Sequence, residues 1–431
     1  MKPLLQTSSI DELTAHQFAR VQSLLTENLP DNRFWQTKYA ALDFDPRDLK
    51  SLADFRQLPL VEKSEFVADQ AAHEPYGTNL TYDIGRYTRL HQTSGTTTGH
   101  PLRWLDTPES WDWMLGCWSH IYQLMCLTPA DRLCFPFSFG PFLGFWAGFE
   151  GALRQGNLCL AAGGMSSEAR LKMIEENKIT ILGCTPTYAL RLAETAEEQG
   201  MTLAANSVRG ILVAGEAGGN IPSTRERITQ AWGSRVYDHW GMTEIGPLAS
   251  EADDDPGHLT VLESECLPEI IDPQSLQPVS PGEIGELVIT NFGRTGSPVI
   301  RYRTGDLVRA ATSEHASGRS WLRLSGGILG RVDDMLTIRG NNVFPSSVEA
   351  ILREFVEIVE FRLVVTQQRE MHHLRIEIEP AADLADKLQQ DVVVRVCRVI
   401  KDRLNFQAEI LTVATGSLPR FEMKARRLVR E

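Results

Sequence analysis

The sequence of 431 residues is short of positive charge, with 43 lysines and arginines against 56 aspartates and glutamates and a formal net charge of −13. Proteins that bind nucleic acid neutralise its phosphates with a basic surface, so this composition argues against nucleic acid as a partner. The net negative charge of the chain repels anions. If the chain binds an anion, local backbone amides and single basic residues must therefore supply the attraction.

The sequence also lacks an apolar run long enough to span a membrane. Its most apolar stretch is residues 133–149, LCFPFSFGPFLGFWAGF, which has no charged residue but contains two prolines and three glycines. A spanning helix needs about 20 apolar residues, so we expect a buried wall of a globular protein and no membrane partner. The first residues, MKPLLQTSSIDEL, lack the apolar core of a signal peptide.

Paired cysteines are missing as well. The seven cysteines are scattered, without a CxxC pair, at positions 117, 126, 134, 159, 184, 266 and 397. An odd, unclustered set without a signal peptide predicts reduced thiols and a cytoplasmic location.

The pattern of apolar residues changes along the chain and predicts a mixed α/β and α+β fold. Residues 8–75 have helical spacing, with Ser9 as a cap for a helix over 11–29. Strand-like segments at 157–164, 179–186 and 208–219 alternate with helix-like segments at 167–178, 187–200 and 221–233. This alternation predicts a parallel sheet covered by helices.

Residues 258–325 differ, because short alternating segments with turn residues between them predict antiparallel sheet or a small barrel. A compact α+β pattern follows Gly330, with helices expected at 345–355 and 382–404. We therefore expect two domains, residues 1–330 and residues 331–431.

A loop rich in hydroxyl groups and glycine, TSGTTTG at 93–99, is the first candidate site. Successive backbone N–H groups in a glycine-rich turn form an anion-binding concavity, and hydroxyls add uncharged donors, so the loop suits a polyphosphate. It is not a P-loop, because His100 stands where that motif requires lysine. A solvated linker of the same composition is equally compatible with these residues alone.

Four further motifs carry polar chemistry, and each also has a structural explanation. They are YDHWGMTE (237–244), RYRTGDL (301–307), GRVDDMLTIRGNNVFPSSVE (330–349) and Lys424 near the end of the chain. The motif at 237–244 could stack a purine and place a hydroxyl and a carboxylate near phosphate or metal. Alternatively, it is a packed strand end. Asp306, in a predicted Gly-Asp turn, could accept two ribose hydroxyls, or it is an ordinary turn residue. Residues 330–349 could equally be a charged linker, and a lysine in a basic tail is usually solvated.

In this order and spacing, the five motifs resemble those of the adenylate-forming superfamily, most closely the phenylacetate–coenzyme A ligase family. The resemblance extends over nearly the whole chain, including IDPQSLQPVSPGEIGELVIT (271–290) and GSLPRFEMKARRL (416–428). It implies a large AMP-binding domain, which includes a small barrel-like part, and a small mobile C-terminal domain. It also implies an ATP-dependent ligase that converts a carboxylic acid into acyl-AMP and transfers the acyl group to coenzyme A.

The resemblance implies a role for each matching residue. Thr243 and Glu244 match a pair in which the threonine contacts the α-phosphate and the glutamate binds Mg²⁺, and Lys424 matches the lysine that bridges carboxylate and α-phosphate. The other expected ATP and coenzyme A contacts are Ser94, Gly95, Thr96, Thr97, Gly99, Glu216, Ala217, Asp238, Trp240, Gly241, Asp306, Arg331 and Gly340. Asp333 matches the hinge at which the small domain turns between the two half-reactions, and Gly340 then lines the thiol tunnel.

The chain departs from the family pattern at several of these motifs. His100 follows the phosphate loop where lysine is frequent, Trp240 replaces a tyrosine, and Met423 replaces a glycine before the lysine. Ala252 stands where some relatives have a cysteine that helps to hold zinc, which leaves Glu251, His258 and Cys184 or Cys266, so zinc is not expected.

The aromatic stretch from Phe135 to Trp146 stands where the family forms the acid-binding wall, joined by residues 183–190 and 246–248. An uncharged aromatic lining favours a flat apolar acid, so we expect an aryl or arylacetic substrate, unless these rings are simply core. The sequence leaves open transfer to a carrier-protein phosphopantetheine, a protein cysteine or an amine. A non-catalytic nucleotide-binding module and a nucleotide hydrolase are weaker alternatives. Members of the family are often dimers, so a homodimer is one expected state.

Overall fold

The computed structural model describes residues 8–42, 44–93, 101–137, 139–338, 341–368, 371–381, 384–421 and 425–431. The chain divides into two compact units, each made of two segments. The first joins Met1–Gly163 to Tyr237–Gly327, and the second joins Gly164–Val236 to Ile328–Glu431. The expected division into residues 1–330 and 331–431 stays a prediction.

The first unit begins with helices, as the sequence predicts for residues 8–75. Helix α1 (Ile10–Ser23) begins after Ser9, whose hydroxyl accepts from the backbone N–H of Glu12 in a capping box. A π-helical turn and three further helices follow, at Leu24–Asn28, α2 (Arg33–Tyr39), α3 (Leu52–Phe55) and α4 (Lys63–Ala72).

Two groups of antiparallel strands form the framework that carries the predicted site residues of the first unit. One group is part of a larger mixed sheet and has the order β7, β8, β9, β13, which are Arg235–Met242, Gly246–Ala252, Asp255–Val261 and Arg323–Ser325. The other is a meander of β10 (Cys266–Ile271), β11 (Ile284–Asn291) and β12 (Tyr302–Arg309). The antiparallel pattern predicted for residues 258–325 is therefore confirmed.

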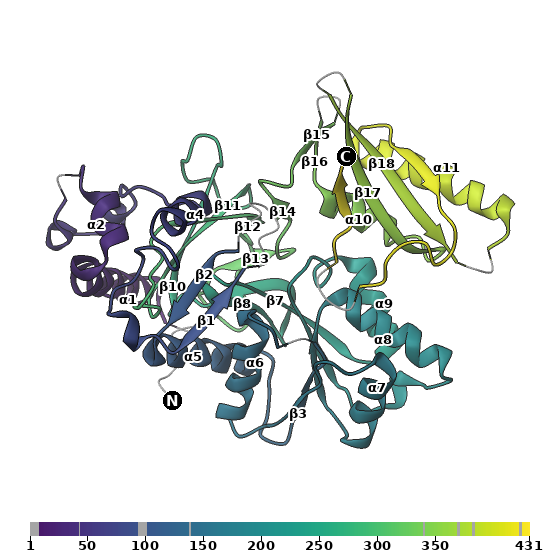
Figure 1. Cartoon of the computed structure of the whole chain (residues 1–431), viewed down its shortest axis with the longest axis horizontal. Helices are drawn as coiled ribbons and strands as arrows, with labels where there is room; N and C mark the ends of the chain where they lie inside the picture. Colours follow the sequence, from purple (N-terminus) through teal and green to yellow (C-terminus); the bar gives the residue numbers. More distant parts are fainter. Residues whose placement is uncertain are drawn as a thin grey trace. The chain divides into compact units, whose positions relative to one another are not determined.

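The apolar stretch at 133–149 is divided between a strand and a helix. Strand β3 (Arg132–Phe135) pairs in parallel with β4 (Leu158–Ala161), and α6 (Leu143–Arg154) packs against α5 (Pro108–Leu124) (Figure 1). Within the residues described above, no helix is long and apolar enough to cross a membrane. A hairpin of β1 (Arg89–Gln92) and β2 (Arg103–Asp106) flanks the hydroxyl-rich loop.

The second unit contains the predicted alternation of strands and helices. Strands β5 (Ile181–Cys184) and β6 (Gly210–Val213) are parallel neighbours. The helices of this part are α7 (Ser167–Glu176), α8 (Pro186–Glu198) and α9 (Pro222–Trp232). Helix α8 packs against both α7 and α9, and the indole of Trp232 donates to the carbonyl of Ala189 over 2.9 Å.

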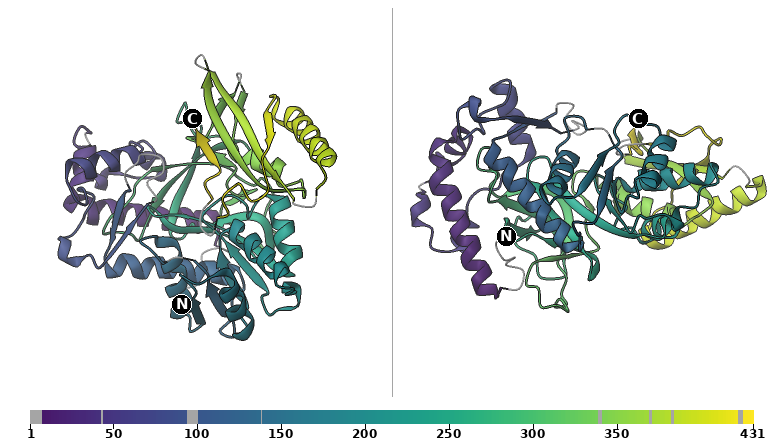
Figure 2. Two further views of the ribbon diagram at one scale, coloured as in Figure 1. Left: turned by 45° about the vertical axis from the view of Figure 1, so that its right-hand side comes forward. Right: turned by 90° about the horizontal axis from the view of Figure 1, so that it is seen from below.

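The rest of the second unit is a separate sheet with its own apolar core. The sheet has the order β16 (Asn341–Val343), β15 (Leu336–Ile338), β18 (Met371–Pro380), β17 (Ile358–Gln368), β20 (Leu428–Arg430), and β19 (Glu409–Thr412) also pairs with β18. Helices α10 (Pro345–Leu352) and α11 (Asp386–Leu404) pack together, and α11 is the long yellow helix beside this sheet in Figures 1 and 2. Val392, Val396 and Ile400 of α11 are buried in its core.

Candidate active site

Seven of the predicted site residues lie outside the described residues. They are Ser94, Gly95, Thr96, Thr97, Gly99, Gly340 and Lys424. The remaining predicted residues divide between the two units.

In the first unit, Trp240 and Asp306 contact each other although 66 residues separate them in the sequence. The indole N–H of Trp240, on β7, donates to Oδ2 of Asp306 over 2.8 Å. Both residues are buried, with Asp306 only 5% exposed. A carboxylate can accept from more than one donor at a time, and ribose hydroxyls are donors of this kind.

The predicted turn at Gly305-Asp306 is wrong, because β12 continues through both residues as a bulge. Arg303 pairs with Val288 and Leu307 with Glu286, so three residues of β12 face one residue of β11. Gly305 has a φ of 76°, a conformation that residues with a side chain rarely adopt. Bulges redirect side chains next to functional sites, and the extra residues here include Asp306.

Hydrogen bonds hold the bulge in place. The hydroxyl of Thr304 donates to the carbonyl of Leu287 over 2.7 Å and accepts from the N–H of Asp306 over 3.1 Å. The N–H of Gly305 donates to Oε1 of Glu286 over 3.1 Å. Side chains of the same meander therefore fix the backbone of the bulge.

Thr243 and Glu244 lie in the tight turn between β7 and β8. Glu244 is 2% exposed, and its Oε1 has no hydrogen-bond partner in the described part of the chain. A buried carboxylate is costly unless a cation or donor compensates it, so this oxygen fits a ligand of a hard divalent cation.

Lys63 provides the nearby positive charge that the sequence analysis missed. Its Nζ lies 3.1 Å from Oε1 of Glu244, outside hydrogen-bonding geometry, and its side chain is 31% exposed. Lys63 begins α4, some 180 positions earlier in the chain, and no motif in the helical segment around it distinguishes this lysine from solvated ones.

A fully buried ion pair supports the Thr243–Glu244 turn. The guanidinium of Arg294 donates to both oxygens of Asp106 over 2.7 Å, and it also donates to the carbonyl of Thr243. Neither side chain of the pair is exposed. Burial raises the pKa of Asp106, but the charge and hydrogen bonds of Arg294 and His91 together outweigh it and hold that pKa below its usual value.

We expect Arg294→Met to destabilise the first unit by about 3–5 kcal/mol, because it leaves a buried carboxylate without its counter-ion. Urea unfolding followed by tryptophan fluorescence measures the change. Arg47→Met is the matched control, since Arg47 pairs with Asp45 at the surface and its loss should leave the free energy of unfolding nearly unchanged. Equal effects of the two substitutions would contradict the supporting role of the buried pair.

Asp238 and Gly241 belong to the same strand, β7. Oδ1 of Asp238 accepts from the N–H of His239 over 3.1 Å, and the Asp238 N–H donates to Glu251 over 3.1 Å. A Cβ on Gly241 would lie 2.8 Å from the carbonyl oxygen of Gly246, so a side chain there would clash with the opposing strand. Burial lowers the pKa of His239 to about 4, so this imidazole stays neutral at physiological pH.

The aromatic stretch expected to form the acid-binding wall is partly core. Phe135 and Phe137 are buried, with 1% and 4% exposed, which fits a packing role. Phe139 and Trp146 are half-buried and meet edge to face with ring centroids 4.9 Å apart. The indole N–H of Trp146 donates to the carbonyl of Phe139 over 2.9 Å. These last two rings are the better candidates for a binding surface.

In the second unit, Glu216 and Ala217 follow β6. Oε1 of Glu216 accepts from the N–H of Thr187 over 3.0 Å, and its Oε2 accepts from the N–H of Ala425 over 2.6 Å. Ala217 is exposed. Arg331, in the short strand β14 (Gly330–Arg331), binds Asp333 through contacts of 2.8 and 3.1 Å.

Comparison with known proteins decides the family. The model of the AMP-binding enzymes matches residues 92–294, and the model of the AMP-binding enzyme C-terminal domain matches residues 340–431. Phenylacetate–coenzyme A ligase of Escherichia coli is 29% identical over 98% of this chain and 96% of its own. The enzyme of the same name from Thermus thermophilus is 26% identical over 98% and 97%.

The chain belongs to the AMP-binding enzymes, and it is similar to phenylacetate–coenzyme A ligases over nearly its whole length.

Solved structures agree with this family. A crystal structure of 2-hydroxyisobutyryl-CoA ligase, described as postadenylation and in complex with R3-HIB-AMP, has a TM-score of 0.93 at 27% identity and covers 99% of this chain and 91% of its own. The same ligase in its thioesterification state, with 2-HIB-AMP and CoA, has a TM-score of 0.75. The adenylate-forming fold predicted from the sequence is confirmed, and so is the predicted class, an ATP-dependent, AMP-forming acid–coenzyme A ligase.

Proposed function

We propose that this member of the family activates an aryl or arylacetic acid as acyl-AMP and transfers the acyl group to coenzyme A. The observation that carries the proposal is likeness to phenylacetate–coenzyme A ligases over 98% of the chain, together with a buried pair, Trp240 and Asp306, at the expected nucleotide contacts. In the first half-reaction, the substrate carboxylate attacks the α-phosphate of ATP and pyrophosphate leaves. In the second, the thiol attacks the acyl carbonyl and AMP leaves.

The residues of the first unit would bind the adenylate. Asp306, oriented by the Trp240 indole, accepts hydrogen bonds from the ribose hydroxyls. Thr243 donates its hydroxyl to the α-phosphate, and Arg294 holds the backbone of that turn through the Thr243 carbonyl. Catalysis then depends on positioning and on charge stabilisation around phosphorus.

Glu244 would hold Mg²⁺, because its buried Oε1 lacks a hydrogen-bond partner among the described residues. When bound, the ion neutralises charge on the phosphates of ATP. Lys63 compensates the same carboxylate in the protein alone, and its partly exposed ammonium can turn toward solvent or phosphate. The hydroxyl-rich loop at 94–99 is proposed to bind the β- and γ-phosphates.

Asp306→Asn should weaken ATP and AMP binding by about tenfold, because a charged acceptor of two hydroxyls becomes a neutral amide. Isothermal titration with AMP measures the change directly, without catalysis. Asp272→Asn is the matched control, since Asp272 caps an exposed turn of the same meander. Unchanged AMP affinity in Asp306→Asn would remove the ribose assignment.

The substrate class has a second candidate. Because the ligase with a TM-score of 0.93 is named for 2-hydroxyisobutyryl-CoA, a short hydroxy acid competes with the aryl acids. The half-buried rings of Phe139 and Trp146 favour a flat apolar acid. Thioester formation with phenylacetate, benzoate and 2-hydroxyisobutyrate, each at equal concentration, decides between the classes by their kcat/KM values.

The acceptor is tested with the same acids. Coenzyme A, free pantetheine, a phosphopantetheinylated carrier protein and simple amines are offered to the acyl-AMP-forming protein in turn. The proposal expects coenzyme A to be preferred. A preference for the carrier protein would shift the function to loading of a protein-bound arm, which is the alternative that the sequence leaves open.

A further inference from the structure

One carboxylate in the second unit binds two segments that are far apart in the sequence. Oε1 of Glu216 accepts from the N–H of Thr187 in the first turn of α8, where helix N–H groups lack partners within the helix. Oε2 of Glu216 accepts from the N–H of Ala425 over 2.6 Å. Ala425 is the residue directly after Lys424, so this bond fixes the backbone next to the lysine in sequence.

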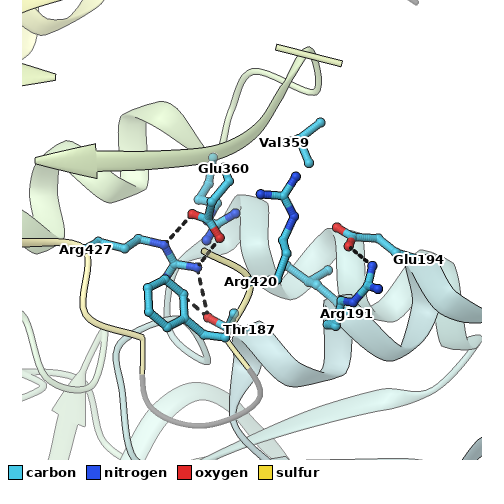
Figure 3. A pocket seen from close by; sticks show the side chains of 10 residues that line it. Thr187, Arg191, Glu194, Val359, Glu360, Arg420 and Arg427 are labelled. Carbon is cyan, nitrogen blue, oxygen red and sulfur yellow. Dashed lines mark hydrogen bonds and ion pairs between the residues drawn. The ribbon is translucent and has the colours of Figure 1, made fainter. Parts of the chain in front are cut away.

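Arg427 provides a second connection to α8. Its guanidinium forms a two-pronged pair with Glu360, with contacts of 2.7 and 3.0 Å. Two of its nitrogens also donate to the hydroxyl of Thr187 over 3.3 Å each, as the dashed lines in Figure 3 show. Glu349 lies 3.4 Å from the same guanidinium.

The bonds of residues 425–427 join them to two different parts of the second unit. Arg427 precedes β20 and Glu360 lies on β17, two strands that pair directly, so their ion pair belongs to one sheet. Thr187 and Glu216 belong to the strand-and-helix part of the unit, at residues 164–236. Bonds from these two residues to 425–427 can therefore break while the Arg427–Glu360 pair stays intact.

The cavity beside these bonds also favours a contact that can open and close. A small open cavity lies between α8 and the sheet, lined by Arg191, Glu194, Val359 and Arg420 besides Thr187 and Glu360 (Figure 3). Its lining is mainly charged, and its arginines have carboxylate partners such as Glu194 and Glu379. If α8 and the sheet move apart at such a charged, incompletely filled cavity, little apolar surface becomes exposed to solvent.

We propose that Thr187 and Glu216 are positioning residues that hold residues 425–427 for acyl-AMP formation and release them for thioester formation. The inference rests on the proposed function, because it assigns these bonds to the half-reaction that uses Lys424. Neither residue needs to touch the reacting atoms for this role. Each acts through the backbone or side chain of the segment that follows the lysine.

Thr187→Val tests the inference most cleanly, because it removes the hydroxyl with little change of shape. We expect acid-dependent exchange of pyrophosphate into ATP to fall about 5- to 10-fold, the size typical for loss of such a hydrogen bond. Thioester formation from supplied acyl-AMP and coenzyme A should stay within about twofold of the parent protein, since that step does not require the contact. Thr187→Ser restores a hydroxyl and should restore exchange.

Thr195→Val is the matched control, since it makes the same change on the same helix, where the hydroxyl binds only the carbonyl of Arg191 among the described contacts. It should change neither half-reaction. Glu216→Gln should reduce exchange as Thr187→Val does, although its proposed place beside the adenine adds an effect on ATP affinity.

Equal losses in both half-reactions, or no loss in Thr187→Val, would overturn the positioning role. If the parent protein shows exchange with a suitable acid, such a result removes only this inference. If the parent protein shows no exchange with any acid, the proposed function itself fails.

Discussion

Replacement of Lys424 by alanine should abolish acyl-AMP formation and spare most of thioester formation from supplied acyl-AMP. The ammonium of this lysine is proposed to contact the attacking carboxylate and the α-phosphate at once, which a compact cation can do. Loss of one such contact to developing charge typically lowers a rate by about 10²–10³-fold. Pyrophosphate exchange measures the first half-reaction, and release of AMP from synthetic acyl-AMP measures the second.

Lys401→Ala is the control for this experiment, because Lys401 is an exposed lysine on α11 of the same unit. It should leave both half-reactions unchanged. If Lys424→Ala slowed both half-reactions to the same extent, its assignment to acyl-AMP formation alone would be wrong.

Glu244→Gln should raise the Mg²⁺ concentration needed for half-maximal pyrophosphate exchange by about tenfold or more. The substitution keeps the shape of the side chain and removes the negative charge that attracts the ion. It also leaves the ammonium of Lys63 without its buried partner. A Mg²⁺ titration at saturating ATP and acid measures the effect.

Glu109→Gln serves as the control, because Glu109 is an exposed carboxylate of the same unit and pairs with Arg86 at the surface. Its Mg²⁺ requirement should equal that of the parent protein. Full activity of the parent protein in metal-free buffer with chelator would exclude Glu244 as the holder of an essential ion.

The local elements of the fold were predictable because they depend on neighbouring residues. Apolar periodicity indicated the strand–helix alternation of residues 157–233, and Ser9 marked the start of the first helix. The pairing of Trp240 with Asp306 was not visible, although the sequence singled out both. Each lies in a motif with its own turn signals, and only the contact between strands of two different sheets brings the motifs together.

The missed features depend on contacts between residues distant in sequence. The sequence at the Gly305 bulge predicts a turn, because glycine before aspartate is common in both turns and bulges. Lys63 compensates Glu244 from a helix with no motif of its own. Sequence reasoning assigned Glu216 one role, beside the adenine, whereas its carboxylate binds Thr187 and Ala425 in the structure.

The resemblance in the sequence therefore identified the chemistry, and the structure supplied the supporting contacts. Arg294 and Asp106 illustrate the difference, since neither stands in a motif that the family resemblance singled out. Their pair holds the carbonyl of Thr243 from residues 51 positions away or more. Such supporting pairs are identified by burial and geometry, which a single sequence does not contain.

The most direct test of the account is acid-dependent exchange of labelled pyrophosphate into ATP, measured without coenzyme A across aryl, arylacetic, hydroxy and fatty acids. If the protein is the proposed ligase, exchange requires both Mg²⁺ and one class of acid, with aryl or arylacetic acids the most effective. Absence of exchange with every acid, in protein that still binds AMP, would contradict it and favour a nucleotide-binding module without catalysis.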